Sequence, residues 1–156
     1  MDRAKPDHSL FLEPLREMFE NKIPFNRLLG MKVVSFEEDG ACIRIDMRED
    51  FVGNFFLETL HGGVIFSVLD VVGGMTSVAG LIKKLRADLS KETAERFSKI
   101  GTIDMRIDFI RPGRGKYFLG TGTQLRTGNK VAVNRMELRN DEGELIAAGT
   151  GTYLVG

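Results

Sequence analysis

The sequence places one acidic residue inside a long apolar segment that follows a histidine and two glycines. Residues 61–70 read HGGVIFSVLD, and Asp70 is the only charged residue from Val64 to Ile82. Withdrawing a carboxylate from water costs free energy, so we expect Asp70 to be kept there for chemistry. Proton transfer and nucleophilic attack are the reactions open to such a group. Asp70 is therefore the first candidate for a catalytic residue.

The segment around Asp70 has the spacing of an amphipathic helix. Its apolar residues recur at alternating steps of four and three residues, which places them on one face that we expect to pack against a sheet. This apolar row consists of Val64, Val68, Val71, Met75, Val78 and Ile82. A second row of small residues, with the carboxylate among them, consists of Gly63, Ser67, Asp70, Gly74 and Ser77. Such a row lets another backbone approach closely.

The length of this apolar helix would also allow it to cross a bilayer. Asp70 near its middle would cost about 3 kcal/mol on insertion scales, and the adjacent Gly73 and Gly74 lower the hydrophobicity further. We therefore expect a helix buried inside the fold and no membrane insertion.

Composition narrows the class of protein. The 156 residues suit a single globular domain. Lysine and arginine total 22 and are balanced by 22 aspartates and glutamates, so no general charge favours nucleic acid or an anionic membrane as a partner. Cys42 is the only cysteine, which excludes an internal disulfide. The polar start MDRAKPDHSL lacks the apolar core of a secretory signal, so we expect a cytoplasmic location.

The remaining segments are typical of an N-terminal helical part followed by strands. We expect a helix over Leu10–Asn21 and a short turn of helix over Phe25–Leu29 that ends at Gly30. A connecting loop is expected over residues 48–60, and a charged, partly helical surface segment over Lys83–Lys99. The predicted strands are Met31–Phe36 and Ala41–Met47, joined as a hairpin, and then Thr102–Ile110, Lys116–Arg126, Lys130–Asn140 and Glu144–Val155.

The connections between the later strands are short and rich in turn residues. They read RPGRG, TGN and NDEG, and they favour antiparallel pairing of most neighbouring strands. We therefore predict the α+β class, with a curved antiparallel sheet around one long buried helix. In this interpretation residues 1–30 form an N-terminal helical segment and residues 31–156 form the main domain.

This order of elements resembles the hotdog fold: two strands, a loop, HGG, a long helix and then antiparallel strands. An aspartate nine residues after the histidine of HGG resembles the PaaI-like group of hotdog thioesterases. GTIDMRIDFIRPGRG at Gly101–Gly115 and RTGNKVAVNRMELRNDEG at Arg126–Gly143 are similar to segments of bacterial acyl-CoA thioesterases. The similarity extends from Pro24 to the end of the chain.

The resemblance implies that the chain hydrolyses medium- to long-chain fatty acyl-CoA to a free acid and coenzyme A. Asp70 would activate the hydrolytic water as a general base or attack directly as a nucleophile, and both routes stay open. The attacked carbonyl gains negative charge, which backbone N–H groups at Gly62 and above all Gly63 can stabilise. His61 either assists there or caps the helix. Non-catalytic acyl-CoA binding and a hotdog dehydratase or hydratase activity remain alternatives.

Helix geometry adds a prediction about assembly. Seven residues separate Gly63 from Asp70, so the two lie about 10 Å apart along a helix axis and cannot easily act on one atom. An antiparallel helix of a second chain would bring Asp70 of one subunit near His61 and Gly63 of the other. We therefore predict an obligate homodimer with composite sites, as the family is described, and leave a homotetramer open.

Two further positions are candidates for the catalytic site. Thr102 matches a family position whose hydroxyl helps to hold the attacking water. Asn54 lies seven residues before His61, one more than in related enzymes, and Glu58 stands where many have glycine. Asn54 is therefore either a catalytic residue or a turn residue.

Coenzyme A carries phosphates, for which arginine and lysine are the natural partners. The candidates in the turns are Arg111, Arg114, Arg126 and Lys130. The candidates to line an acyl tunnel are Phe51, Phe55, Phe56 and Leu57. We find no metal-ligand spacing and no nucleotide-binding loop in the sequence, so we expect no metal and no cofactor, with coenzyme A entering only as part of the substrate.

Overall fold

The computed structural model of the chain describes residues 9–85 and 95–156. The charged segment predicted over Lys83–Lys99 therefore lies partly outside the described residues. Within them, the long helix continues to Leu85, and residues 95–97 form a helical turn.

The N-terminal part is helical, as predicted. Helix α1 (Ser9–Glu17) continues into a π-helical turn, η1 (Met18–Lys22), and α2 (Pro24–Leu29) follows. Gly30 ends α2 in the left-handed conformation with φ 67°. Glycine adopts that conformation without a steric penalty, which confirms the predicted end of the turn.

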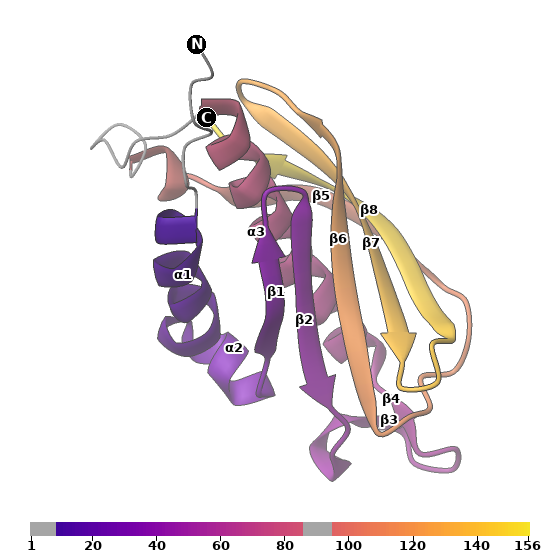
Figure 1. Ribbon diagram of the computed structural model, residues 1–156. Coiled ribbons are helices and arrows are strands. Elements are labelled where there is room, and N and C mark those ends of the chain that lie inside the picture. Colours follow the sequence, from indigo (N-terminus) through magenta and orange to yellow (C-terminus); the bar gives the residue numbers. More distant parts are fainter. Residues whose placement is uncertain (1–8, 86–94) are drawn as a thin grey trace.

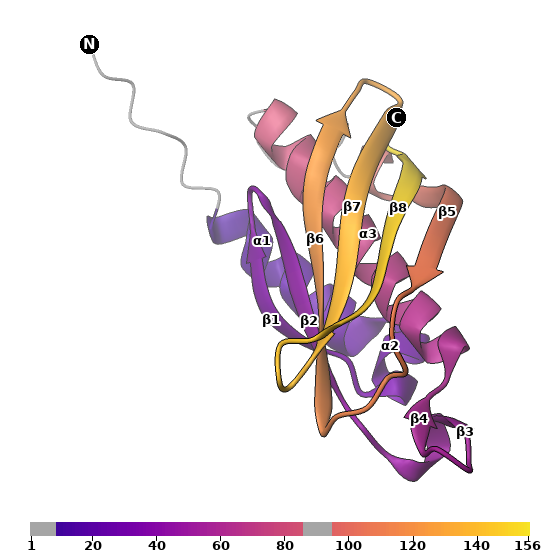
Figure 2. The ribbon, with the colours of Figure 1, turned by 90° about the vertical axis from the view of Figure 1, so that its right-hand side faces the viewer.

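The main sheet has six strands in the order β1-β2-β6-β7-β8-β5, and every neighbouring pair is antiparallel (Figure 2). The predicted strands are therefore confirmed, with ends that differ by at most one residue. Their bounds are β1 (Lys32–Glu37), β2 (Gly40–Asp46), β5 (Gly101–Phe109), β6 (Tyr117–Thr127), β7 (Val131–Asn140) and β8 (Leu145–Leu154).

The connection between β5 and β6 departs from the expected pairing of neighbours. β5 pairs with β8 and forms one edge of the sheet, whereas β6 lies between β2 and β7. The RPGRG segment is held away from a tight turn because Arg111 N–H donates to the Ile146 carbonyl at 3.1 Å and Leu60 N–H donates to the Gly113 carbonyl at 2.9 Å. It therefore crosses from one edge strand to the middle of the sheet.

The expectation of a plain loop over residues 48–60 was wrong. This stretch contains a short 3₁₀ helix, η2 (Glu49–Phe51), and a two-stranded hairpin formed by β3 (Val52–Asn54) and β4 (Thr59–Leu60). The Asn54 side chain closes the hairpin turn by accepting hydrogen bonds from the N–H groups of Phe56 (3.0 Å) and Leu57 (3.3 Å). Glu58 takes the left-handed conformation with φ 50°, the geometry for which glycine is better suited.

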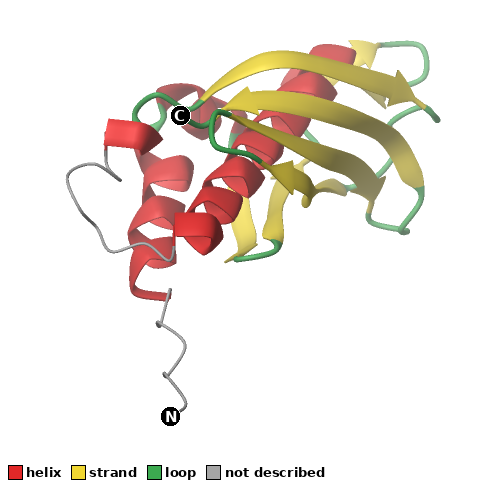
Figure 3. Ribbon diagram, turned by 90° about the horizontal axis from the view of Figure 1, so that it is seen from above, coloured by secondary structure: helices red, strands yellow, loops and turns green. Residues whose placement is uncertain are grey.

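Helix α3 (Gly62–Leu85) lies along one face of the sheet, and α1 lies on the other side of α3 from β5 (Figures 1–3). The helix is long and apolar enough to span a membrane, but 72% of its most apolar window is buried inside the fold, as expected for a core helix. Gly120 and Gly122 of β6 let the sheet approach Val68, Val72 and Thr76 of α3.

The face of α3 that meets the sheet is rotated from the predicted apolar row. Val72 and Thr76 contact the sheet although they are not in that row, whereas Val71 of the row faces a cavity beside α1. The row of small residues also divides. Ser77 is buried and accepts a hydrogen bond from Asn134 at 2.6 Å, while Asp70 and Gly74 stay partly exposed at the cavity.

Candidate active site

His61 precedes the first turn of α3 and caps it. The Gly63 N–H donates to His61 Nδ1 at 2.8 Å, and the His61 carbonyl accepts from Val64 (3.0 Å) and Ile65 (3.2 Å). Because Nδ1 is an acceptor in this contact, the proton of the neutral imidazole is on Nε2. Gly53 of β3 makes room for this histidine, since a Cβ there would come within 2.6 Å of His61 Cα.

This capping contact changes which N–H group is available at the start of α3. The sequence favoured the Gly63 N–H as the donor to a substrate oxygen, but that N–H is occupied by His61. The Gly62 N–H has no hydrogen-bond partner among the described residues. A Cβ at Gly62 would lie 3.5 Å from the Phe109 ring, so that ring closes one side of the position.

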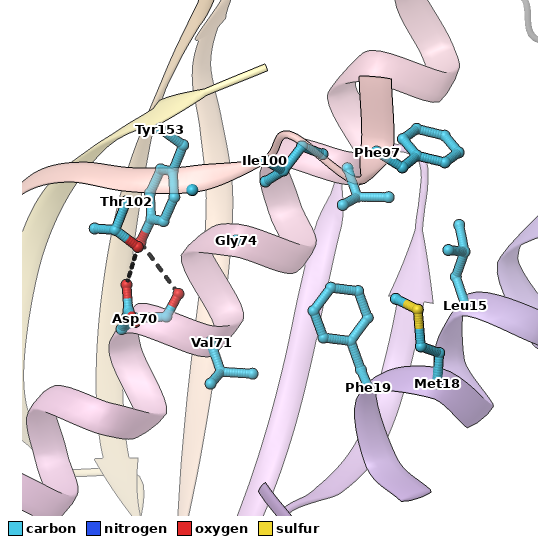
Figure 4. Close-up of a pocket in the computed structure, with 12 residues that line it drawn as sticks. Leu15, Met18, Phe19, Asp70, Val71, Gly74, Phe97, Ile100, Thr102 and Tyr153 are labelled. Carbon is cyan, nitrogen blue, oxygen red and sulfur yellow. Dashed lines mark hydrogen bonds between the residues drawn. The ribbon is translucent and has the colours of Figure 1, made fainter. Parts of the chain in front are cut away.

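Asp70 lies two turns further along α3, opposite the start of β5. Thr102 Oγ1 donates to Asp70 Oδ1 at 2.6 Å, a short hydrogen bond of the kind that ionised acceptors form (Figure 4). Asp70 Oδ2 receives no hydrogen bond from the described residues. The carboxylate is partly exposed rather than buried, so the desolvation expected from the sequence is only partial.

Tyr153 of β8 holds the backbone at Asp70, a contact that the sequence analysis missed. Its hydroxyl donates to the Asp70 carbonyl oxygen at 3.2 Å (Figure 4). Burial and the Asp70 charge both raise the pKa of Tyr153, so the hydroxyl stays protonated and remains a donor. A Cβ at Gly73 would overlap the Tyr153 ring, which explains one of the two adjacent glycines. That glycine pair was the available sequence signal for a large ring packed on α3.

An apolar cavity of about 280 Å³ opens beside the Asp70–Thr102 pair, and we call it the Asp70 cavity (Figure 4). One wall comes from α1 and η1, the opposite wall from α3, and the far end from residues 97–101. Its lining residues are Leu15, Met18, Phe19, Asp70, Val71, Gly74, Val78, Phe97, Ile100, Gly101, Thr102 and Tyr153.

Two more open hollows lie along the boundary between α3 and β5. The first contains Phe66 and Ser67 together with Asp70 and Thr102, so the carboxylate faces both it and the Asp70 cavity. The second lies at the start of α3 and contains Gly62, Phe109 and Arg111. The Phe66 and Phe109 rings, 6.5 Å apart, stand between the two hollows.

The four basic residues that are candidates for binding coenzyme A do not lie together in the fold. Arg111 lines the hollow at Gly62, and its Nη1 donates to the Leu145 carbonyl at 3.1 Å. Arg114 belongs to the same connection and is exposed. Arg126 and Lys130 flank Thr127, whose carbonyl accepts from Lys84 near the end of α3 at 3.4 Å. The two pairs therefore lie about 30 Å apart along α3.

The residues proposed for an acyl tunnel do not line the Asp70 cavity, and Phe55 lines a separate open hollow with Met47 and Val52. Phe55 and Phe56 are 74% and 82% exposed at the tip of the β3–β4 hairpin, where their ring centroids lie 4.1 Å apart. Leu57 is also exposed, and Phe51 is a buried core residue. Asn54 uses its side-chain oxygen within the same hairpin turn, as the turn interpretation predicts. Apolar surface beside Asp70 comes instead from the N-terminal helices.

Among the described residues, no group of three histidine, cysteine, aspartate or glutamate side chains is placed to hold a metal ion. The polar groups that could take part in a reaction include the Asp70 carboxylate, the Thr102 hydroxyl, the capping His61 and the unpartnered Gly62 N–H. Such a set is suited to base-assisted attack on a carbonyl, because it combines a proton acceptor with a donor for the developing oxyanion.

Comparison with known proteins agrees with this geometry. The chain is 44% identical over 145 residues to the medium/long-chain acyl-CoA thioesterase YigI of Escherichia coli K12, covering 93% of this chain and 94% of the relative. A thioesterase superfamily-related protein from Shewanella oneidensis superposes with a TM-score of 0.93 at 45% identity, over 98% of this chain and 100% of the other. Zebrafish thioesterase superfamily member 2 shares the fold, with a TM-score of 0.72 at 24% identity over 93% and 98% of the two chains.

The family pattern of the Thioesterase superfamily matches residues 57–147, which include the start of α3, Asp70 and β5. The predicted α+β hotdog architecture and the predicted thioesterase class are thereby confirmed. The family match over residues 57–147 and the similarity over nearly the whole chain agree, so this chain belongs to the Thioesterase superfamily.

Proposed function

We propose that the protein hydrolyses medium- to long-chain fatty acyl-CoA, with Asp70 as the general base. The observation that carries the proposal is the Thr102–Asp70 hydrogen bond of 2.6 Å at the mouth of an apolar cavity. This arrangement places a proton acceptor, held by Thr102, beside a space that can take an acyl chain. The relative at 44% identity, named for medium/long-chain acyl-CoA, supports the substrate class. A cytoplasmic location remains our prediction.

Asp70 acts on water in this proposal rather than on the substrate. Thr102 holds Oδ1, which leaves Oδ2 to accept a proton from a water molecule. The water oxygen then bonds to the thioester carbon, and the carbonyl oxygen becomes negative. Collapse of this intermediate breaks the carbon–sulfur bond, and the proton held by Asp70 passes to the leaving thiolate. The products are the free acid and coenzyme A.

The Gly62 N–H is the donor to the carbonyl oxygen in this reaction. We assign it in place of the Gly63 N–H because the latter already donates to His61 Nδ1. His61 then has a positioning role, since its contact with Gly63 fixes the first turn of α3. The N-terminal end of the helix dipole adds to the stabilisation of the oxyanion.

Two chains are needed to assemble one complete site. Gly62 and Asp70 are eight residues apart on α3, which is about 12 Å along the axis, so one carbonyl cannot contact both within a chain. An antiparallel α3 from a second copy would bring Gly62 of one subunit to Asp70 of the other. We therefore assign the composite site to a homodimer, and pairing of two dimers stays open.

Arg111 is the first candidate for the phosphates of coenzyme A. It lines the hollow that contains Gly62, so a thioester carbonyl at Gly62 would leave the rest of the coenzyme near this arginine. Arg114, in the same connection, is the second candidate. Arg126 and Lys130 lie near the other end of α3 and cannot join Arg111 on one coenzyme within a single chain.

The proposal is tested by thiol release from a panel of acyl-CoA substrates. We expect Asp70→Asn and Asp70→Ala to lower kcat at least 100-fold, since a positioned general base contributes about 10²–10⁴-fold. Asp46→Asn is the matched control, because Asp46 is exposed on β2, away from β5, and pairs with Arg44 at 2.7 Å. Full activity in a folded Asp70→Ala variant would exclude the assignment.

A single turnover in oxygen-18 water tests for covalent attack by Asp70, because label in the Asp70 carboxyl group arises only from an acyl-aspartyl intermediate. Direct attack of water puts the label into the released fatty acid and leaves the protein unlabelled. An acyl-aspartyl intermediate opened at the side chain would put the label into the Asp70 carboxyl group, which mass spectrometry of the peptide detects. Label in that peptide would replace the general base by a nucleophile.

A further inference from the structure

The N-terminal helices contribute a wall to the cavity that contains the proposed catalytic carboxylate. We propose that α1 and η1 form the acyl-chain site and that Met18 and Phe19 set the length of chain accepted. The inference rests on the proposed thioesterase function, and it gives residues 9–22 a direct role in substrate selection. It also moves the acyl site from the exposed hairpin of β3 and β4 to the opposite flank of Asp70.

The arrangement of polar and apolar groups in the Asp70 cavity supports this role. Asp70 and Thr102 stand together at one end, whereas Leu15, Met18 and Phe19 approach from α1 and η1 on the opposite side (Figure 4). A thioester whose carbonyl lies at the carboxylate can therefore extend its acyl chain between the two helices. Ligand sites commonly combine apolar walls with a few fixed polar groups in this way.

The size of the cavity indicates a chain of medium length. The open space beside the carboxylate is about 280 Å³. A methylene group occupies nearly the volume of a liquid water molecule, about 30 Å³, so the cavity holds roughly nine carbons. We expect octanoyl and decanoyl chains to fill it.

The two wall residues differ in how firmly they are held. Phe19 packs edge-on against Phe36 with ring centroids 6.2 Å apart, and its carbonyl accepts a hydrogen bond from buried Asn26 at 2.8 Å. Met18 is partly exposed and has an unbranched, adaptable side chain. Phe19 is therefore the more firmly packed of the two, and Met18 is the lining residue whose shortening disturbs the core least.

The wall is also fixed to the sheet by charged side chains. Arg16 donates to the Val33 carbonyl at 2.7 Å, and Glu20 accepts from the Val33 N–H at 2.8 Å. These contacts bracket Met18 and Phe19 in sequence, so the backbone that carries both residues is anchored on each side. A fixed wall is what selection by chain length requires, because a mobile one would adapt to every chain.

Substitutions that enlarge or shrink the Asp70 cavity test the inference. Met18→Ala enlarges it, and Val71→Phe fills it from the α3 side. We compare kcat/KM for hexanoyl-, octanoyl-, decanoyl-, dodecanoyl- and palmitoyl-CoA. Each methylene in an apolar site changes selectivity by about tenfold or more. We expect the dodecanoyl-to-octanoyl ratio to rise about tenfold in Met18→Ala and to fall about tenfold in Val71→Phe.

Leu28→Ala is the matched control, since Leu28 belongs to the same N-terminal part but is exposed and away from the Asp70 cavity. Its length profile is expected to equal that of the unaltered protein. If the protein hydrolyses acyl-CoA and neither cavity variant shifts the optimum, the acyl chain lies elsewhere and the inference is wrong.

Binding of free decanoate, followed by calorimetry, separates this inference from the proposed function. If the unaltered protein hydrolyses no acyl-CoA but binds decanoate, and Val71→Phe weakens that binding about tenfold, the cavity assignment stands and the catalytic proposal fails. If decanoate binding is equal in the two proteins, the cavity is not the acyl site.

Discussion

The two edge strands of the main sheet differ in whether other parts of the chain cover them. At β1, the N-terminal helices cover the edge, and their side chains bind both backbone groups of Val33 through Arg16 and Glu20. At β5, no other strand among the described residues pairs with the outer side, and Ile103 and Phe109 are 57% and 54% exposed. One edge is closed by the chain itself, and the other is open.

This difference suggests a separate role for each edge strand, association for β5 and substrate selection for the side of β1. An open strand with exposed apolar side chains is a template for pairing with another strand, and native proteins normally block such edges. β5 carries Thr102, so the open edge is also where the Asp70 site lies. The covered edge instead supports the wall of the Asp70 cavity. We therefore expect association at β5 and substrate selection beside β1.

The largest effect is expected from a charge on the open edge. Ile103→Lys places a charge beside the strand that we expect to meet a second copy, and lysine is a residue that edge strands use to prevent pairing. We expect the dimer to dissociate and kcat/KM to fall at least 100-fold, because the composite site is lost. Light scattering over a concentration series, together with thiol release, measures both effects.

Val34→Lys is the control for that variant, since Val34 is a β-branched residue, 51% exposed, on the covered edge strand. It is expected to leave both mass and activity unchanged. A monomeric Ile103→Lys protein that retains full activity would show that one chain forms a complete site.

Sequence reasoning succeeded where the signal is local. The hairpin of β1 and β2, the later strands and the left-handed Gly30 follow from alternation and turn residues within a few positions. The start of the long helix at HGG and the place of Asp70 on it were also predicted, because one carboxylate in an apolar helix is conspicuous in any sequence. These features need no knowledge of which segments meet in space.

The parts that sequence reasoning missed depend on contacts between distant segments. Turn residues give the direction of β5 but not its partner, which is β8 rather than β6. Tyr153 contacts Asp70 across 83 positions. The adjacent Gly73 and Gly74 indicate that something large packs on α3, but they do not say which residue it is. The exposure of Phe55 and Phe56 was not predictable either, because hydrophobicity alone does not tell a core residue from a hairpin tip.

The closed edge is tested by removing its anionic anchor. Glu20→Ala leaves the N–H of buried Val33 without a partner, and an unsatisfied buried donor costs about 1–3 kcal/mol. We expect the free energy of unfolding to fall by that amount in urea denaturation, with the dimer retained. Glu17→Ala, an exposed position on α1, should change it by less than about 0.5 kcal/mol.

The same anchor makes the closed edge sensitive to acid. Burial raises the pKa of Glu20. Hydrogen bonds from Val33 and Lys32 and the nearby charges of Lys32 and Arg16 together lower it by more, so the pKa lies below its ordinary value of 4.5. A carboxyl whose pKa is lowered by folding stabilises the folded state above its unfolded value, and that contribution is lost as pH falls through the folded value.

Glu20→Gln removes this titration while keeping the size of the side chain. We expect the unaltered protein to be more stable than Glu20→Gln at pH 7 and the difference to shrink steadily below pH 4.5. Thermal unfolding of both proteins over a pH series measures it. A difference that stays constant down to pH 3 would show that the Glu20 charge does not hold the edge.

The smallest effect is expected at the cationic anchor, where Arg16 Nη2 donates to the Val33 carbonyl. Arg16→Lys keeps the charge but replaces the planar fork by a single ammonium group on a shorter stem, which reaches the carbonyl less well. Because a carbonyl at an edge can also bind water, the loss should not exceed about 1 kcal/mol. Urea denaturation beside an Arg27→Lys control on α2 measures it. A loss as large as that of Glu20→Ala would mean that the arginine, not the glutamate, is the main closure of the β1 edge.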